Sequence, residues 1–445
     1  MNKTIKFGTD GIRGDANSFP FDTQSLITLG YSIAQWSIKK YKKSNPKILI
    51  GHDTRESCAA IKKDLETGLL NFDLEILDAQ IMPTPAICKI INTDKSFDFG
   101  IIISASHNKY QDNGIKLVDA KKGKLSLTDE KIIETNFKNN FNNIKIGNLN
   151  KSGSIKLFDN SIEKYIEILE NNFSNKLLLN KKIVLDCANG ATYKIAPIIF
   201  QNLGAQIIAI NTTPNGKNIN ENCGSLHIEQ LTKNVIENKY DFGFAFDGDG
   251  DRVIAVDKYG EKIDGDQIIA ILTNHKKAAN LKTVVGTSMT NLGLDLHLQK
   301  RNINLVRTDV GDKYIAKELR AKKLFLGGES SGHIIMTDYL NVGDGIFTAL
   351  RTIETIIENN ILNPKQFNYA PQTLINMPVK EKKDLNINPI PQIIEKYKNI
   401  LKTGRILIRY SGTENILRIM TEGEDEIITK NIAQNIAQEL DNILN

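Results

Sequence analysis

The hydrophobic residues of this chain form short apolar runs that alternate with longer segments of mixed polarity. Short apolar runs are typical of buried strands, whereas apolar positions spaced by three and four residues are typical of helices. In the first part of the chain, this pattern predicts strands at 47–51, 74–77 and 99–103 and a helix at 56–70. Strands that alternate with helices indicate an α/β domain.

The same pattern restarts twice along the chain. A second unit is predicted to have strands at 182–185, 206–210 and 242–246 and a helix at 192–203. A third is predicted to have strands at 283–287, 304–307 and 324–326, with helices from residue 292 and at 313–319. The sequence therefore predicts three similar α/β/α sandwich domains, which we place at residues 1–155, 156–255 and 256–368.

The composition changes after a predicted helix at 345–358, where prolines begin to flank a smaller unit. This unit is predicted to have strands at 372–379, 405–409 and 416–420 and a final helix at 427–444. The pattern indicates a C-terminal α+β domain at residues 369–445.

Two of the predicted strands have similar sequences, and each leads into a polar loop. Phe97-Asp98-Phe99-Gly100 leads to Ser104-Ala105-Ser106, and Tyr240-Asp241-Phe242-Gly243 leads to Asp247-Gly248-Asp249. A divergent internal repeat explains this similarity, and chance likeness of two buried strands is the alternative.

Composition limits the class of protein. The 445 residues carry a formal charge of only +5, which fits attraction for anionic metabolites better than nucleic-acid binding. The four cysteines form no CxxC pair, so a reducing compartment is expected. The N-terminus lacks the apolar core of a signal peptide, and no apolar run reaches the ~18 residues of a membrane span. We expect a soluble cytoplasmic protein without nucleic-acid or membrane partners; a homodimer is an assembly that the sequence allows.

The loop Ser104-Ala105-Ser106-His107-Asn108 follows the apolar strand at 99–103. Ligands of α/β folds bind at the carboxyl ends of strands, so Ser106 is placed where a ligand would lie. Lys116, further along the chain, could bring a cation back to this loop. Taken alone, the serine also fits an ordinary turn.

The segment Asp247-Gly248-Asp249-Gly250-Asp251-Arg252 is more specific. Three carboxylates at alternate positions, separated by glycines, can turn several oxygens towards one hard cation. The spacing fails the EF-hand pattern, because Arg252 and Lys258 stand where glycine and glutamate would be. We therefore predict a magnesium site rather than a solvated acidic turn.

Three further segments offer groups for an anionic sugar. Residues 327–333 form a glycine-flanked loop with Glu329, Ser331 and His333, and its G-x-S-x-G is followed by a predicted strand rather than the helix of a nucleophile elbow. Residues 409–418 combine two arginines with hydroxyls around a glycine, which suits a phosphate cradle. Residues 8–14 add a glycine-rich loop that carries Arg13.

Taken together and in this order, these segments resemble the α-D-phosphohexomutase superfamily over essentially the whole chain. The sequence motifs on which the resemblance rests lie at residues 7–14, 103–116, 186–193, 247–252, 285–291, 327–333 and 409–418.

The resemblance implies four domains around a central cleft, each contributing one loop. By position, Ser106 corresponds to a phosphoserine, and with Asp247, Asp249 and Asp251 it would bind one Mg²⁺ per active site. The candidates for charge stabilisation and proton transfer are Arg13, His107, Lys116 and His333. The residues implied to bind the sugar phosphate are Arg252, Glu329, Ser331, Arg409, Ser411, Gly412, Thr413 and Arg418.

The sequence departs from the family pattern in three places. Lys109 and Asn415 each stand where the family usually has proline, and Asn341-Val342 replaces a threonine pair. None of these changes removes a reacting group. They put in question the rigidity of the loops, above all the loop that carries Ser106.

The resemblance implies a hexosamine monophosphate and a sugar bisphosphate as ligands. We expect interconversion of glucosamine 6-phosphate and glucosamine 1-phosphate for UDP-N-acetylglucosamine and cell-wall precursor synthesis, with glucose or mannose phosphates as the alternative substrates. Two other classes stay open: a haloacid dehalogenase-type phosphatase that uses Asp247, and a non-catalytic sugar-phosphate binding protein. The phosphatase would leave Ser106 and the C-terminal arginines unexplained.

Overall fold

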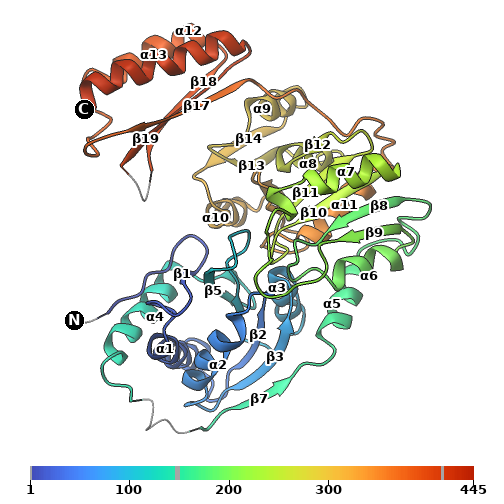
Figure 1. Ribbon diagram of the computed structural model, residues 1–445, viewed down its shortest axis with the longest axis vertical. Coiled ribbons are helices and arrows are strands. Elements are labelled where there is room, and N and C mark those ends of the chain that lie inside the picture. Colours follow the sequence, from blue (N-terminus) through green and yellow to red (C-terminus); the bar gives the residue numbers. More distant parts are fainter. Residues whose placement is uncertain (1–2, 146–150, 412–414) are drawn as a thin grey trace.

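The computed structural model describes residues 3–145, 151–411 and 415–445, and these form three α/β parts and a C-terminal part. The N-terminal part lies at the bottom of Figure 1, the C-terminal part lies at the top, and the other two lie between them. Each part has its own sheet. This confirms the predicted fold class.

The first part contains a seven-stranded sheet of order β1-β5-β4-β2-β3-β7, with β6 beside β5. β4 is buried along its whole length, as its unbroken apolar run predicts for a central strand. The elements are β1 (Ile12–Asp15), α1 (Thr23–Tyr41), β2 (Lys47–His52), α2 (Cys58–Leu69), β3 (Glu75–Ile81), α3 (Thr84–Thr93), β4 (Phe99–Ile103), β5 (Asp112–Asp119), β6 (Gly123–Lys124), α4 (Leu127–Asn140) and β7 (Ser154–Leu157).

The second and third parts contain sheets of five and four strands. The elements of the second are α5 (Ser161–Glu170), β8 (Lys182–Asp186), α6 (Ile195–Asn202), β9 (Gln206–Ile210), α7 (Glu229–Asn238), β10 (Phe242–Phe246), β11 (Val253–Asp257) and β12 (Lys262–Ile263). Those of the third are α8 (Gly265–Leu272), β13 (Thr283–Thr287), α9 (Leu292–Gln299), β14 (Asn304–Thr308), α10 (Asp312–Lys322), β15 (Leu326–Gly328), β16 (Ile334–Met336) and α11 (Gly345–Glu358).

One strand order recurs in all three sheets. It reads β3-β2-β4-β5 in the first, β9-β8-β10-β11 in the second and β14-β13-β15-β16 in the third. In each, the first three strands are parallel and the fourth is antiparallel to the third. The connections between the third and fourth strands hold the serine loop, the three aspartates and Glu329. The shared topology supports the internal repeat and puts corresponding loops at corresponding places.

The C-terminal part is a three-stranded antiparallel sheet of order β17-β19-β18 with two helices. Its hydrophobic core is separate, whereas one apolar cluster runs through the other three parts. Its elements are β17 (Gln372–Pro378), α12 (Ile390–Leu401), β18 (Arg405–Tyr410), β19 (Ile416–Glu422) and α13 (Glu426–Leu444). The C-terminal part is therefore a distinct body that rests on the third.

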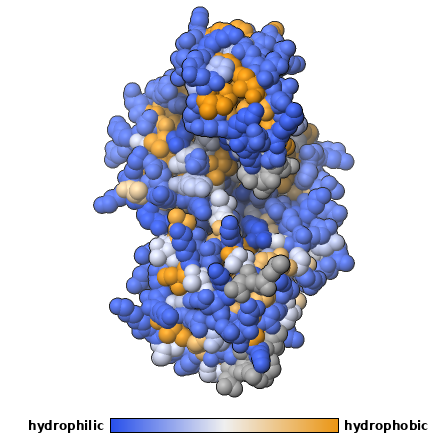
Figure 2. Space-filling view, turned by 90° about the vertical axis from the view of Figure 1, so that its left-hand side faces the viewer, coloured by the Kyte–Doolittle hydropathy of each residue, from blue (hydrophilic) through white to orange (hydrophobic). Residues whose placement is uncertain are grey.

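The surface below the C-terminal part is hollowed and mainly hydrophilic (Figure 2). Such a surface suits a polar ligand better than a membrane or an apolar partner. Among the described residues, none of the helices combines the length and hydropathy of a membrane span. The four cysteines are buried and unpaired: Cys58, Cys88, Cys187 and Cys223.

Candidate active site

The loop after β4 places Ser106 in contact with the loop after β10. Ser106 is 2% exposed and has a left-handed backbone, with φ at 54°. Its amide donates to the Ser104 hydroxyl at 2.9 Å, which stabilises this tight turn. Its Oγ donates to Asp247 Oδ2 at 2.6 Å. The predicted nucleophile therefore lies against the predicted metal ligands, although 141 positions separate the two residues.

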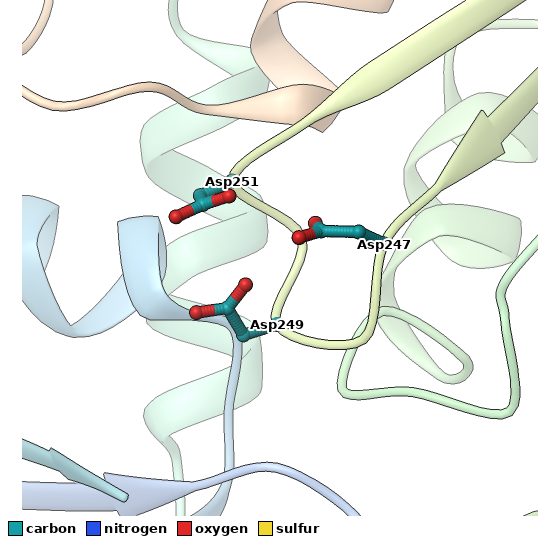
Figure 3. Close-up of side chains that lie close together, drawn as sticks. All are labelled: Asp247, Asp249 and Asp251. Carbon is teal, nitrogen blue, oxygen red and sulfur yellow. The ribbon is translucent and has the colours of Figure 1, made fainter. Parts of the chain in front are cut away.

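Asp247, Asp249 and Asp251 point towards one another from the tight connection between β10 and β11 (Figure 3). One oxygen of each lies within 4.8 Å of the others, and all three side chains are buried. Within the described ranges, Asp249 Oδ1 and Asp251 Oδ1 are buried without a hydrogen-bond partner. Buried acceptors without donors are costly, and oxygen ligands suit a hard cation. The three residues thus fit a metal ion.

Electrostatics at this cluster point the same way. Burial, reinforced by the other two carboxylates, raises the pKa of Asp247 well above its usual range. Burial acts on Asp251 in the same direction, but the charge of Lys116, helped by the neighbouring His333 side chain, outweighs it and lowers the pKa of Asp251. A bound cation would relieve the repulsion that raises the pKa of Asp247.

Lys116, on β5, supplies the fixed positive charge beside the aspartates. Its ammonium group lies 2.8 Å from Asp249 Oδ2, 3.4 Å from Asp251 Oδ2 and 2.8 Å from Asp10 Oδ2. Burial alone would lower the pKa of Lys116, but these carboxylates raise it well above its usual range. Lys116 was predicted to approach the serine loop, and in the structure its ammonium group contacts the predicted metal ligands Asp249 and Asp251.

Arg13 and Asp10 extend this network to the N-terminal loop. Arg13 donates to Asp10 Oδ2 at 2.6 Å, while a second guanidinium nitrogen is buried without a partner among the described residues. A buried donor of this kind is available to an anionic ligand.

The two predicted histidines contact different members of the cluster, His107 the serine and His333 an aspartate. His107 Nδ1 is 3.3 Å from Ser106 Oγ, and burial, helped by Arg252, lowers the pKa of His107 to about 4. His107 is therefore neutral near pH 7 and can accept a proton. His333 Nδ1 lies 3.6 Å from Asp251 Oδ1.

His333 is subject to opposing effects. Burial would lower its pKa, but Asp251 and Asp312 outweigh burial and raise it to about 9. However, the Gly343 amide donates to His333 Nε2 at 3.1 Å, which requires an unprotonated Nε2. The hydrogen-bond geometry therefore favours a neutral ring with its proton on Nδ1, facing Asp251.

The predicted sugar-binding residues lie at the rim of this cluster. Arg252 donates its amide to Asp247 Oδ1 at 3.1 Å, which fixes the end of the aspartate loop. Glu329 is 8% exposed, and its Oε1 accepts from the Gly311 amide at 3.0 Å. Ser331 is half-buried in the turn that follows Glu329.

The predicted phosphate cradle lies in the C-terminal part. Arg409 and Arg418 are directly paired on β18 and β19, and Ser411 follows β18. The ends of these strands point towards the first part (Figure 1). In residues 3–145, 151–411 and 415–445, no hydrogen bond or ion pair joins Arg409, Ser411 or Arg418 to the Ser106 cluster. Gly412 and Thr413 lie outside the described residues.

Comparison with known proteins places this arrangement in a family. Models of the phosphoglucomutase/phosphomannomutase domains match in order: α/β/α domain I at residues 4–144, domain II at 163–260, domain III at 264–367 and the C-terminal domain at 374–439. Phosphoglucosamine mutase from Syntrophotalea carbinolica is 42% identical, over 98% of this chain and 97% of that protein. The one from Syntrophus aciditrophicus is 40% identical, over 98% and 99%.

The chain belongs to the phosphoglucosamine mutase family.

A solved structure of Aspergillus fumigatus N-acetylphosphoglucosamine mutase, in complex with GlcNAc-6P and magnesium, has the same fold. Its TM-score is 0.70 at 16% identity, over 98% of this chain and 96% of that one. Membership in the phosphoglucosamine mutase family excludes the haloacid dehalogenase-type phosphatase, because four phosphoglucomutase/phosphomannomutase domains match in order between residues 4 and 439. It likewise makes this chain an isomerase rather than a non-catalytic binding protein.

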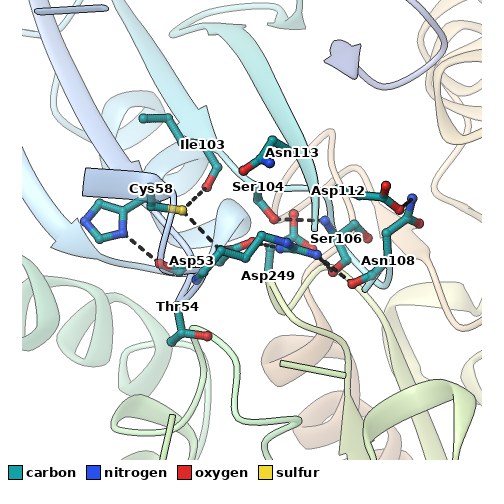
Figure 4. Close-up of polar contacts among 12 residues, drawn as sticks. Asp53, Thr54, Cys58, Ile103, Ser104, Ser106, Asn108, Asp112, Asn113 and Asp249 are labelled. Carbon is teal, nitrogen blue, oxygen red and sulfur yellow. Dashed lines mark hydrogen bonds and ion pairs between the residues drawn. The ribbon is translucent and has the colours of Figure 1, made fainter. Parts of the chain in front are cut away.

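The loop that carries Ser106 is braced by residues that sequence analysis missed. Arg55 donates to the Asn108 carbonyl at 2.7 Å and to the Ser106 carbonyl at 3.3 Å. Asn220, from the second part, donates to the same two carbonyls at 3.0 and 2.9 Å. Asp53 pairs with Arg55, and Figure 4 shows Asp53 beside the serine loop. The position of residues 53–55 at the carboxyl end of a strand was the available signal.

These contacts bear on Lys109, which stands where phosphohexomutases usually have proline. Asn108 also donates its side-chain amide to Asp112 Oδ2 at 2.9 Å, and the Asp112 amide donates to the Lys109 carbonyl at 3.2 Å. Hydrogen bonds on both sides of Lys109 therefore hold the turn in place of a proline ring.

Proposed function

We propose that the protein interconverts glucosamine 6-phosphate and glucosamine 1-phosphate through a phosphate carried on Ser106. The observation that carries this proposal is the hydrogen bond from Ser106 Oγ to the aspartate cluster, at a site where Lys116 adds a fixed positive charge. A serine in that place can exchange a phosphoryl group under strong charge stabilisation. Full-length similarity to phosphoglucosamine mutases supports the choice of sugar.

The proposed reaction has two balanced transfers. In the first, the bond between Ser106 Oγ and phosphorus breaks while a sugar hydroxyl oxygen bonds to phosphorus; the hydroxyl proton passes to a base, and the released Ser106 Oγ takes up a proton. In the second, Ser106 Oγ gives up its proton and bonds to the other phosphate of the resulting bisphosphate, while the sugar oxygen released from that phosphate regains a proton. His107, neutral and 3.3 Å from Ser106 Oγ, and His333 are the groups placed to carry these protons.

Asp247, Asp249 and Asp251, together with the Ser106 phosphate, are proposed to hold one Mg²⁺. When bound, that ion would draw negative charge from the transferred phosphoryl oxygens. Lys116 provides charge from the chain itself, because it contacts Asp249 and Asp251, and Arg13 adds charge through Asp10, which it shares with Lys116.

The sugar is proposed to bind between the third and C-terminal parts. Glu329 and Ser331 would accept or donate hydrogen bonds to its hydroxyls, and Arg252 would face its reacting phosphate. The phosphate that does not react would lie in the cradle, which must accept either end of the bisphosphate as it turns. The cradle consists of Arg409, Ser411, Gly412, Thr413 and Arg418.

The product would feed synthesis of UDP-N-acetylglucosamine and cell-wall precursors in the cytoplasm, by a chain that acts alone or as a homodimer. Glucose and mannose phosphates are the competing substrates, since they differ from glucosamine phosphate by little. Binding pockets discriminate weakly between such analogues. Comparison of kcat/KM for the three sugar 6-phosphates tests the preference, and a higher value for glucose or mannose would overturn it.

The carrier role of Ser106 is tested by Ser106→Ala. The variant should retain its fold but lose mutase activity. Intact-mass and peptide spectra should find phosphate on Ser106 in the wild-type protein and no corresponding phosphate in the variant. Asp249→Asn should fold, yet should need a higher Mg²⁺ concentration for half-maximal activity. Full activity of Ser106→Ala would refute the phosphoserine mechanism.

A further inference from the structure

An ion pair between Lys124 and Asp312 joins the first part to the third beside the active site. Lys124 belongs to β6, and Asp312 is the first residue of α10. Their side chains are only 20% and 12% exposed. A partly buried pair of this kind is screened less by solvent than a surface pair.

The Asp312 end of the pair belongs to the turn that holds Glu329. The amide of the preceding residue, Gly311, donates to Glu329 Oε1 at 3.0 Å. Asp312 Oδ2 lies 3.6 Å from His333 Nε2. Movement of this one turn would therefore displace both Glu329 and the surroundings of His333.

The Lys124 end of the pair belongs to the network around Ser106. Lys124 donates to Asp10 Oδ1 at 2.9 Å, and Asp10 Oδ2 lies 2.8 Å from Lys116. Lys116 in turn contacts Asp249. Lys124 thus ties the turn before α10 to the group of charges that surrounds the aspartates.

The packing around the pair is incomplete. A cavity of about 40 Å³ lies beside it, lined in part by Asp10, Lys116, Lys124, Asp251 and Asp312. This space is large enough for a water molecule, so side-chain packing alone does not fix the turn at this place. Two polar contacts cross between the first and third parts here: the Lys124–Asp312 ion pair and the hydrogen bond from Lys313 Nζ to the Gly8 carbonyl, 3.4 Å long.

We propose that Lys124 and Asp312 are positioning residues, whose ion pair sets where the Glu329 loop lies relative to Ser106. Neither touches the reacting atoms. The inference rests on the proposed function, because it takes Glu329 as a ligand of the sugar. It predicts that breaking the pair impairs transfer to the sugar without impairing the phosphoserine itself.

Asp312→Asn tests this inference with little change of shape and leaves the Lys124–Asp10 contact intact. We expect kcat/KM for glucosamine 6-phosphate to fall about 10-fold or more, because misplacement by about 1 Å can cost up to about 100-fold. Hydrolysis of the phosphoserine by water, measured without sugar, should stay within about twofold of the unmodified enzyme, since it does not need Glu329.

Lys124 provides the second arm of the test. Lys124→Met should lose a similar factor and Lys124→Arg should restore most of it, because arginine keeps the charge. The double variant Lys124→Met/Asp312→Asn should lose about as much as the worse single variant, rather than the product of both losses. Lys164→Met is the matched control, since it removes an ion pair between a different pair of parts, the first and the second: Lys164–Asp94 at 2.8 Å.

Several results would overturn the inference. They are an unchanged kcat/KM in Asp312→Asn, an equal loss of sugar transfer and phosphoserine hydrolysis, or multiplicative losses in the double variant. A wild-type protein that forms phosphoserine but does not isomerise glucosamine phosphates would instead refute the proposed function.

Discussion

Gly248 offers a way to move the serine and aspartate loops apart without removing any functional group. A Cβ built on Gly248 would lie 2.7 Å from the Ser106 carbonyl oxygen and 2.8 Å from Asn220 Nδ2. Arg55 and Asn220 both donate to that carbonyl, so it cannot turn away freely. In Gly248→Ala the two loops must therefore separate.

The separation acts directly on the hydrogen bond from Ser106 Oγ to Asp247 Oδ2, which is 2.6 Å long. Overpacking of this kind costs about 1–3 kcal/mol. If that cost falls on the transition state, kcat should drop about 5- to 150-fold. KM for the sugar phosphate should change little, because Glu329 and the C-terminal arginines are untouched.

Steady-state kinetics with glucosamine 6-phosphate measure this effect, and far-UV circular dichroism checks the fold. Gly153→Ala is a matched control, since its Cβ would meet the Phe72 carbonyl oxygen at 2.6 Å in a loop after the first part's helix α4. That variant should be destabilised but should keep its kcat. A Gly248→Ala enzyme with wild-type kcat would show that the close approach of the two loops does not matter for catalysis.

Two further predictions concern buried charges. Lys116→Met removes the cation shared by Asp10, Asp249 and Asp251, so kcat/KM should fall about 100-fold or more. Steady-state kinetics measure this loss. The control is Lys62→Met, which loses an ion pair with Asp78 instead. Burial, and after it the negative charge of Asp264, raises the pKa of Asp266 to about 7. The free energy of unfolding should therefore fall as pH rises towards 7. Asp266→Asn should remove that slope and add about 1–3 kcal/mol to the free energy of unfolding at pH 8, measured by urea denaturation. Equal slopes in both proteins would contradict it.

The sequence by itself was enough for the repeating strands and for the loops that follow them. An unbroken apolar run such as 99–103 predicts a buried central strand, because every side chain on both faces must avoid water. The aspartates after β10 were predicted to share a cation because they alternate with glycines over five consecutive positions. That spacing is visible in the sequence without knowledge of the fold. These features depend on neighbours in the chain, so the printed sequence contains them.

The tertiary structure decided which distant residues support those loops. Arg55 and Asn220, which lie in different parts of the chain, donate hydrogen bonds to the serine loop. Lys124 forms an ion pair with Asp312, 188 positions further along the sequence. None of these residues lies in a pattern that periodicity can recognise, since Arg55 reaches the Asn108 carbonyl across 53 positions, and Asn220 and Lys124 act across a boundary between parts. Their partners are chosen by how the sheets pack together, and a hydrogen bond or ion pair forms only where that packing brings donor and acceptor within reach.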